Sequence, residues 1–383
     1  MPAPKRRFSG FLSAWEERAL GDIGSFKKGS TLGKSDLSDD GEPCILYGEL
    51  YTKYSEIIME VLSKAYREEG SIPKSKKGDV LIPSSGETAI DISTSSCLLQ
   101  DNVLIGGDIN IFRPIETDGR FISYVLNHKR KKEIARIAQG ASIVHVYGEA
   151  IKRITIPIPS LPEQTKIADF LSLIDSKIGK QEQKVESLEE YKKGLMQKIF
   201  SQEIRFRDEN GEEYPEWEEA KLEEMSSYQS SSLTAAYIRE IQSGEYPVFD
   251  ANSIIAYVGS YSSQKPYISI IKDGAGVGRI VICPGESSVI GTMGMIHNQL
   301  NTNLMYLYYT LLNRDLSIYI SGSTIPHIYY KDYKNMKLAC PSFPEQTKIA
   351  DFLSGIDRKI EKEKQLLETL REGKKGFLQQ MFV

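Results

Sequence analysis

Cysteine, histidine and long apolar runs are scarce in this chain of 383 residues. Its four cysteines, Cys44, Cys97, Cys283 and Cys340, lie far apart without a CxxC pair, so we expect neither a disulfide framework nor a metal site. No apolar run approaches the roughly 18 residues that a membrane span needs, and the start MPAPKRRF lacks an apolar signal core. We therefore expect a protein of the reducing cytoplasm that does not contact a membrane.

The chain also has no excess of positive charge. It carries 48 Lys and Arg against 52 Asp and Glu, a net charge of −4. Because DNA-binding domains are usually clearly basic, composition alone gives no nucleic-acid signal. Any DNA contact would depend on local basic clusters, or on a partner that adds positive charge.

Catalytic signatures are absent as well. The chain has no GxxxxGK[ST] loop, no GxGxxG after a strand and no GxSxG elbow. The GAGVG run from Gly274 comes closest to a nucleotide loop, but its third glycine arrives one residue early. The aromatic-proline tetrapeptides of amino-methyltransferases are also missing, and the four histidines are scattered. We predict a non-catalytic chain that binds no cofactor or metal itself.

What the chain does have is a long internal repeat. The segment PEQTKIADFLSLID from Pro162 returns as PEQTKIADFLSGID from Pro344, with one difference and an offset of 182 residues. Trp15-Glu-Glu is likewise echoed by Trp217-Glu-Glu. A period of this length is far too long for a solenoid repeat, so it indicates domain duplication.

The regions that precede the two repeated segments are barely alike. Each mixes short β-type runs with turn residues, and each has one helical stretch near its end, at 120–138 and at 303–320. This mixture predicts an α+β domain. The β-type runs that stand out are 79–83, 103–106, 267–271 and 279–283. The ends of the two regions are again similar, QGASIVH up to His145 and SGSTIPH up to His327.

Each repeated segment predicts a long helix. Ser160 and its equivalent 182 residues later open a Ser-x-Pro-Glu start that fits a capping box. Apolar residues then follow the alternating 4/3 spacing of a coiled-coil seam, with polar interruptions at Gln181, Lys192, Glu363 and Lys374. The predicted seam residues are Ile167, Leu171, Ile174, Ile178, Val185, Leu188, Leu195, Ile199, Ile349, Leu353, Ile356, Ile360, Leu367, Leu370, Phe377 and Met381.

Two matching seams in one chain favour pairing of the helices with each other, although an amphipathic helix against a domain core would show the same stripe. The pair would be antiparallel if a pseudo-twofold axis relates the two domains. One possible register sets Lys192 opposite Glu363 and Gln181 opposite Lys374. At 1.5 Å per residue, such helices would be roughly 55–60 Å long and could hold two domains a set distance apart.

Polar loops are the candidates for a binding surface. Lys and Ser side chains beside glycine suit phosphate oxygens, and turn-rich loops after strands let a backbone approach a groove closely. For each loop residue, ordinary surface is the alternative, and the recurring histidines could instead bond a backbone carbonyl. The candidate DNA contacts are Lys27, Lys28, Ser30, Ser84, Ser85, Thr88, Ser142, His145, Lys272, Arg279, Thr324 and His327. The dense basic run 128–132 could contact phosphate or simply be a solvated helix end.

This arrangement resembles the specificity subunit of a type I restriction-modification system, a bacterial defence system. The resemblance covers essentially the whole chain, and its most specific feature is the PEQ-containing helix start that follows each variable region. It implies two α/β target recognition domains, 1–160 and 217–342, each followed by a long helix, 161–201 and 343–383. A linker at 202–216 would join the first helix to the second domain. The helices would form an antiparallel coiled coil within an α+β fold with pseudo-twofold symmetry.

The resemblance also implies a function. Each recognition domain would read one half of an asymmetric, bipartite site in double-stranded DNA, and the helices would set the spacing and dock two methyltransferase subunits. Those subunits would use S-adenosylmethionine, while restriction/translocase subunits would use ATP and Mg²⁺, so cofactors are expected on the partners and not on this chain. Two alternatives stay open: a recognition module of a related, non-type-I system, and a coiled-coil scaffold that joins two ligand-binding domains without DNA.

Overall fold

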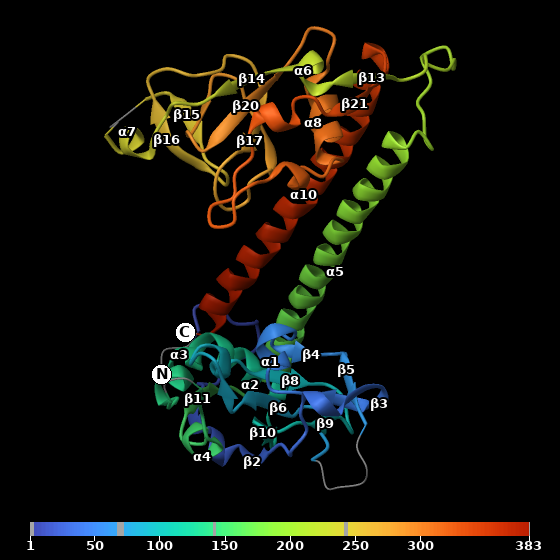
Figure 1. Cartoon of the computed structure of the whole chain (residues 1–383). Coiled ribbons are helices and arrows are strands. Elements are labelled where there is room, and N and C mark those ends of the chain that lie inside the picture. Colours follow the sequence, from blue (N-terminus) through green and yellow to red (C-terminus); the bar gives the residue numbers. More distant parts are fainter. Residues whose placement is uncertain (1–3, 67–72, 141–142, 241–243, 383) are drawn as a thin grey trace. The chain divides into compact units, whose positions relative to one another are not determined.

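The computed structural model describes residues 4–66, 73–140, 143–240 and 244–382. It divides into two compact units. Unit 1 comprises residues 1–182 and 366–383, and unit 2 comprises residues 183–365. Each unit therefore contains one variable region together with parts of both long helices, α5 (Leu161–Phe200) and α10 (Phe343–Met381) (Figure 1).

Unit 1 is built on a five-stranded sheet and a three-stranded sheet. The five-stranded sheet has the order β2 (Gly24–Lys28), β10 (Ile109–Pro114), β6 (Val80–Pro83), β8 (Ser96–Leu98) and β4 (Ile57–Ile58), and the three-stranded sheet has the order β5 (Ser63–Ala65), β3 (Leu37–Ile45) and β9 (Leu104–Ile105). Two further strand pairs are β1 (Glu16–Ala19) with β12 (Thr155–Ile158) and β7 (Ser85–Gly86) with β11 (Val144–His145). The short helices are α1 (Glu49–Thr52), α2 (Gly119–Val125), a π-helical turn (Leu126–Arg130), α3 (Lys131–Ile137) and α4 (Gly148–Ile151), with 3-10 turns at Leu20–Asp22, Lys34–Asp36 and Asp91–Ser93.

Unit 2 repeats this plan. Its larger sheet has the order β14 (Ser226–Ser230), β20 (Met293–Asn298), β17 (Tyr267–Ile271) and β18 (Ile280–Cys283), and its smaller sheet has the order β16 (Ile254–Val258), β15 (Tyr246–Phe249) and β19 (Ser288–Val289). Strand β13 (Glu218–Lys221) pairs with β21 (Lys337–Cys340). The short helices are α6 (Leu222–Met225), α7 (Ala235–Glu240), α8 (Leu304–Leu312), a 3-10 turn (Ser317–Tyr319) and α9 (Tyr330–Tyr333).

The two variable regions share one topology despite their different sequences. The order β2-β10-β6-β8 in unit 1 corresponds to β14-β20-β17-β18 in unit 2. In each smaller sheet the central strand pairs antiparallel on one side and parallel on the other. The predicted fold class, two mixed α and β domains with long antiparallel helices, is confirmed.

Most predicted elements form where the sequence indicates. The apolar runs at 79–83 and 267–271 become β6 and β17, whose residues are all buried, as in a strand covered on both faces. The stretch 120–138 becomes α2, the π-helical turn and α3. The stretch 303–320 is helical only to Leu312. There the chain turns, and the Asp315 carboxylate accepts a hydrogen bond from the Ser317 backbone, which favours a new 3-10 turn over a continued helix.

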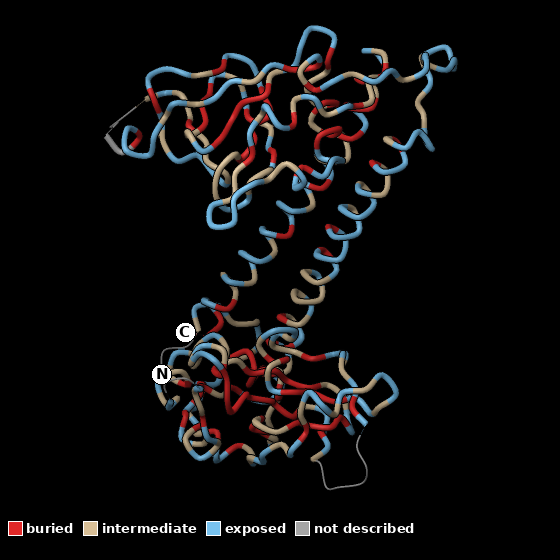
Figure 2. The backbone as a smooth tube through the Cα atoms, viewed as in Figure 1, coloured by how far each residue is buried: buried red, intermediate tan, exposed pale blue. Residues whose placement is uncertain are grey.

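The long helices are part of each unit's core as well as of a helix pair. None of the sixteen predicted seam residues is exposed. In unit 1, Ile167 and Leu171 of α5 and Met381 of α10 belong to the same core as Phe121 of α2. In unit 2, Ile349 and Leu353 play the same part beside Tyr306 of α8. Figure 2 shows the buried residues concentrated inside the two domains. Both readings of the apolar stripe, helix pairing and packing on a domain, are therefore correct.

Candidate functional sites

The glutamate of each PEQ segment anchors a preceding arm of the chain. Glu163 is 1% exposed, and its carboxylate accepts two hydrogen bonds from the Arg7 guanidinium, at 2.8 and 2.7 Å. Glu345 is fully buried and accepts from Arg205, at 3.2 and 3.4 Å, and from the Trp217 indole, at 2.9 Å. The arms therefore attach in the same way to the start of each long helix.

These contacts correct the predicted capping box. Both glutamate carboxylates are engaged by arginine, and the hydroxyl of Ser342 has no hydrogen-bond partner among the described residues. A guanidinium stabilises a buried carboxylate more than a backbone N–H does, so each glutamate binds arginine instead of capping the helix. The residue after each arginine supports the same attachment, since Phe8 packs edge-on against Phe170 and Phe206 against Phe352.

The glutamine of each PEQ segment holds the start of a domain helix. The side-chain oxygen of Gln164 accepts a hydrogen bond from the Asp118 backbone at 3.0 Å, and that of Gln346 accepts one from the Asn303 backbone at 2.9 Å. Asp118 and Asn303 are the N-cap residues of α2 and α8. The PEQ signature is thus an attachment device, a role that the helical reading of the sequence missed.

A lysine, an aspartate and a tyrosine join the helix pair to the domain in unit 2. Lys192 of α5 pairs with Asp357 of α10 at 2.6 Å, and the Tyr309 hydroxyl of α8 donates to the same carboxylate at 2.6 Å. The Lys192 ammonium also lies 5.1 Å from the centre of the Tyr309 ring. Burial, followed by the hydrogen bond to Asp357, raises the pKa of Tyr309, so the tyrosine stays protonated and donates.

Unit 1 contains the equivalent group with the helices exchanged. Lys374 of α10 pairs with Asp175 of α5 at 2.6 Å, and the Tyr124 hydroxyl of α2 donates to Asp175. The Lys374 ammonium lies 5.7 Å from the Tyr124 ring centre. Lys374 lies 182 residues after Lys192, and Asp357 lies 182 residues after Asp175, so the two groups occupy equivalent positions of the repeat. Both lysines occupy polar interruptions of the predicted seam.

Unit 1 adds a second carboxylate to this group. Glu56 pairs with Lys374 at 3.0 Å and contacts His128 Nε2 at 2.8 Å. Burial would raise the pKa of Glu56, but the hydrogen bond with His128 and the charge of Lys374 lower it to about 2. Burial raises the pKa of Asp175, an effect that Lys374 only partly offsets. Lys374 is therefore held between two carboxylates, and its own pKa is raised although burial opposes this.

The observed register differs from the one considered from the sequence. Lys192 faces Asp357 and not Glu363, which instead pairs with Lys184 at 2.7 Å. Lys374 likewise faces Asp175 and not Gln181. The predicted register is wrong because it left a seam lysine facing an amide. In the observed register both lysines meet a carboxylate that also accepts a tyrosine hydroxyl.

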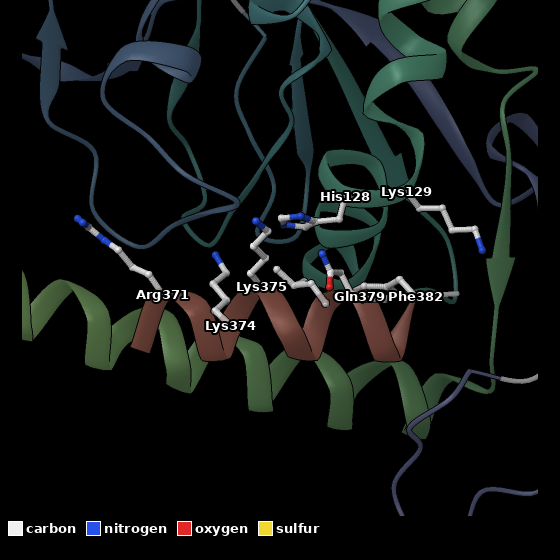
Figure 3. A pocket seen from close by; sticks show the side chains of 8 residues that line it. His128, Lys129, Arg371, Lys374, Lys375, Gln379 and Phe382 are labelled. Carbon is white, nitrogen blue, oxygen red and sulfur yellow. The ribbon is translucent and has the colours of Figure 1, made fainter. Parts of the chain in front are cut away.

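Beside each of these groups lies a groove on the helix surface. The groove in unit 1 has a volume of about 630 Å³ and is lined by His128, Lys129, Arg371, Lys374, Lys375, Leu378, Gln379 and Phe382. Figure 3 shows Arg371, Lys374 and Lys375 projecting from α10 towards the domain. The groove in unit 2, of about 680 Å³, is lined by Glu189, Lys192, Lys193, Met196, Gln197, Leu312, Asn313, Arg314, Asp315, Asp357, Ile360 and Lys364. The two grooves are lined at five equivalent helix positions, which differ in number by 182. These are Glu189, Lys192, Lys193, Met196 and Gln197 in unit 2, and Arg371, Lys374, Lys375, Leu378 and Gln379 in unit 1.

The candidate DNA contacts of unit 1 fall into exposed and buried groups. Lys27 and Lys28 are exposed on β2, where Lys28 lies 3.7 Å from Asp108, while Ser30 is half-buried just beyond that strand. Thr88 is exposed and donates to Asp91 at 2.6 Å. Two further candidates, Ser84 and Ser85, are only 5% and 4% exposed, so their hydroxyls lie beneath the surface. Another, Ser142, lies outside the described residues.

The candidates of unit 2 lie on two adjoining loops. Lys272 is half-buried, and the exposed Arg279 side chain donates to the Ala251 carbonyl and to Asn252 Oδ1. Asp273, next to Lys272, forms an isolated antiparallel β-bridge with His327 through the backbone. Thr324 is exposed in the same loop as that histidine. Unit 1 brings the corresponding loops together, since His145 pairs with Ser85. The alternative for His327 is supported, since its Nδ1 lies 3.2 Å from the Ile325 carbonyl oxygen. As DNA contacts, these residues remain a prediction.

The basic run 128–132 is partly committed to the fold. His128 contacts Glu56, while Arg130 donates to the Thr155 carbonyl at 2.6 Å and pairs with Glu17 at 3.3 Å. Burial lowers the pKa of Lys129. The structural reading of this run therefore accounts for at least two of its side chains.

No group of three or more His, Cys, Asp and Glu side chains in the described parts of the chain is placed to hold a metal ion. None of the described helices combines the length and the apolar character needed to cross a membrane. The four cysteines are free thiols, and burial raises the pKa of Cys44 to about 11.

Comparison with known proteins places the chain in a family. The family described as type I restriction modification DNA specificity domain matches residues 13–190 and 214–372. The chain belongs to this family, and DNA recognition is the role that the family's description names. The resemblance noted from the repeated PEQ helices is confirmed.

Individual relatives agree with this assignment. The chain is 26% identical over 280 residues to the specificity subunit of the type I restriction enzyme MjaVIII of Methanocaldococcus jannaschii, an alignment that covers 63% of this chain and 64% of that subunit. It is 22% identical to the MjaIX specificity subunit of the same organism, covering 94% and 91% of the two chains. The crystal structure of a type I S subunit from M. genitalium has the same fold, with a TM-score of 0.67 at 18% identity over 100% of this chain and 99% of that one.

Proposed function

We propose that this chain is the DNA sequence-recognition subunit of a type I restriction-modification complex, with each domain reading one half of an asymmetric, bipartite site. One observation carries the proposal: the fold and its attachment to the helices are repeated, while the surfaces beside them are not. Strand β2 ends in two exposed lysines, whereas its counterpart β14 ends in Gln229 and Ser230. Domains with different surfaces read different bases, so the two half-sites should differ.

The helix pair is proposed to set the length of the spacer between the half-sites. In each unit a lysine of one helix pairs with an aspartate of the other, and a tyrosine of the domain bonds the same aspartate. The boundaries between the units fall after residues 182 and 365. One heptad inserted after Glu182, with a second heptad inserted after Gln365, would leave every described contact within each unit in place. Such an insertion lengthens each helix by about 10 Å, equivalent to about three base pairs of DNA.

Binding of DNA libraries by the chain with its cognate methyltransferase tests this proposal. We expect two short specific blocks around a free spacer, with affinity that falls steeply as salt rises. The heptad variant should select the same two blocks with a spacer longer by about three base pairs. Altered half-site sequences would refute the spacer role. Absence of salt-dependent, sequence-specific binding would refute DNA recognition and favour the scaffold alternative.

The two grooves are proposed as docking sites for two methyltransferase subunits. A partner present in two copies needs one surface that is present twice, and the grooves share equivalent helix positions. The shared, exposed pairs are Lys193 with Lys375 and Gln197 with Gln379. S-adenosylmethionine would bind to these partners, and ATP and Mg²⁺ to restriction/translocase subunits, so catalysis would take place outside this chain. We place the complex in the cytoplasm.

The stoichiometry of the complex tests the docking sites. The double substitution Lys375→Glu with Gln379→Ala should reduce the methyltransferase from two copies to one in native mass spectrometry, and the equivalent change in unit 2 should do the same. Lys177→Glu and Lys359→Glu are matched controls, because both lysines are exposed on the helices and line neither groove. Two retained copies in both groove variants would refute this assignment.

A further inference from the structure

Each domain carries a small hairpin of the same construction. In unit 1, Gln139 and His145 exchange two backbone hydrogen bonds, of 2.9 and 2.7 Å, and in unit 2 Ser321 and His327 exchange two of 2.9 and 2.8 Å. We call residues 139–140 and 143–147 of unit 1, together with residues 321–329 of unit 2, the paired hairpins. The two hairpins are 182 residues apart, so they belong to the part of the design that was kept after duplication.

A glycine gives both hairpins their shape. Gly140 has φ +123° and Gly322 has φ +91°, values that side chains rarely allow. A Cβ at these positions would lie 2.1 Å from the Ile143 carbonyl oxygen and 2.4 Å from that of Ile325. The glycines are therefore explained by the backbone alone.

The exposed side chains of the paired hairpins are not explained by packing. Ile143 and Ile325 are 60% and 65% exposed, and Tyr147 and Tyr329 are 58% and 47% exposed. Each tyrosine lies beside the preceding histidine of its hairpin, with ring centres 6.4 and 5.0 Å apart. Isoleucine and tyrosine gain little from such exposed positions, yet both copies keep them.

The paired hairpins lie directly against the divergent loops. In unit 1 the Val146 backbone donates to the Ser84 carbonyl at 3.0 Å. In unit 2 the Gly274 backbone donates to the Pro326 carbonyl at 3.0 Å, and the Ile328 backbone donates to that of Lys272 at 2.9 Å. A constant element thus adjoins the loops that carry the candidate base contacts.

We propose that the paired hairpins contact the sugar-phosphate backbone and so position each domain on its half-site. This inference rests on the proposed DNA-recognition function. Residues that read different bases must differ between the domains, whereas the backbone is the same in both half-sites. The hairpin residues fit that ligand, because hydroxyl, imidazole and phenol groups bond phosphate oxygens and no acidic side chain occurs in either segment. The isoleucines would pack on deoxyribose.

A methyltransferase subunit is also common to both domains, but it fits the paired hairpins less well. Stable protein interfaces bury about 800 Å² on each partner, far more than one isoleucine and one tyrosine provide. The grooves on the helices are lined by eight and twelve residues, with five helix positions in common, and so offer that partner more contacts. The position of the hairpins beside the candidate DNA loops therefore favours DNA.

Substitutions in unit 2 test this inference. Thr324→Ala with Tyr329→Ala, in the full chain assembled with its methyltransferase, should weaken binding to specific DNA, to DNA altered in one half-site and to non-specific DNA by the same factor, about fivefold to tenfold. The ratio between these affinities should stay constant. Ile318→Ser and Tyr257→Ala, at positions 72% and 50% exposed in the same unit, are matched controls and should have no effect.

Three outcomes would overturn the inference. Loss confined to one half-site would make the hairpin a base-reading element, and loss of a methyltransferase copy would make it a protein-docking element. Unchanged affinity for all DNAs would leave it without a ligand. The unaltered complex in the same assay separates these results from failure of the proposed function, because that failure would abolish specific binding before any substitution is made.

Discussion

The two units share their framework but differ in how strongly one partly buried lysine is held. In unit 2, Lys192 pairs with Asp357, whose side chain is 37% exposed. In unit 1, the equivalent Lys374 lies between Asp175 and Glu56, at 22% and 12% exposure. The duplicated attachment has thus been kept in both units and reinforced in one. Unit 1 should depend more on its central charge than unit 2 does.

The largest expected effect follows from removing this charge. Lys374→Met leaves the partly buried Asp175 without its cation and Glu56 with only His128, and should destabilise unit 1 by about 3–5 kcal/mol. Lys192→Met leaves a single, more exposed carboxylate and should destabilise unit 2 by only about 1–2 kcal/mol. Urea denaturation with hydrogen exchange resolved by unit measures both. Equal costs would show that the additional carboxylate of unit 1 has no consequence.

Acid should separate the two units next. Because the pKa of Glu56 is lowered from 4.5 to about 2, its ionised form stabilises unit 1 above pH 4.5, and this stabilisation is lost as the pH falls from about 5 to 2. The shift corresponds to about 3 kcal/mol. Glu56→Gln should remove this part of the pH dependence, as seen by denaturation at several pH values. A variant with the pH profile of the unaltered chain would contradict the assignment.

The two tryptophans of the repeated Trp-Glu-Glu segment should respond differently to the same change. The Trp217 indole donates to the buried Glu345 at 2.9 Å, whereas the buried Trp15 nitrogen finds no hydrogen-bond partner in the part of the chain that the structure describes. Trp217→Phe should therefore destabilise unit 2 by about 1–2 kcal/mol more than Trp15→Phe destabilises unit 1. Thermal denaturation of the two variants makes the comparison, and equal losses would refute it.

The smallest effect concerns two surface ion pairs of opposite polarity. Glu182 pairs with Arg371 at 2.6 Å, and their 182-residue counterparts, Lys364 and Glu189, pair at 2.5 Å with the charges exchanged. Arg371→Glu should cost about 0.5–1 kcal/mol, because both groups are half-exposed. Adding Glu182→Lys should restore most of that loss by recreating the charge order of unit 2. A double-mutant cycle measures the coupling, and no recovery would mean that the pairs do not interact.

Much of the framework could be predicted from the sequence because local patterns encode it. The two helix seams, 167–199 and 349–381, depend only on helical periodicity. Strands β6 and β17 depend on short apolar runs. The end of α8 was missed because Asn313 and Asp315 outweigh the helical pattern that continues beyond them. The loops that contain Lys272 and His327 could be named as candidates, but only the fold brings them together.

The sequence by itself determined that this protein is duplicated, helical in its repeated parts and divergent between them, since repeats and periodicity need no long-range information. The tertiary structure alone decided the helix register and the roles of the PEQ residues. Those depend on which distant groups reach a buried charge: Arg7 for Glu163, and Tyr124 with Asp175 for Lys374. A buried charge takes the partner that best compensates its lost hydration, and sequence spacing does not reveal that partner.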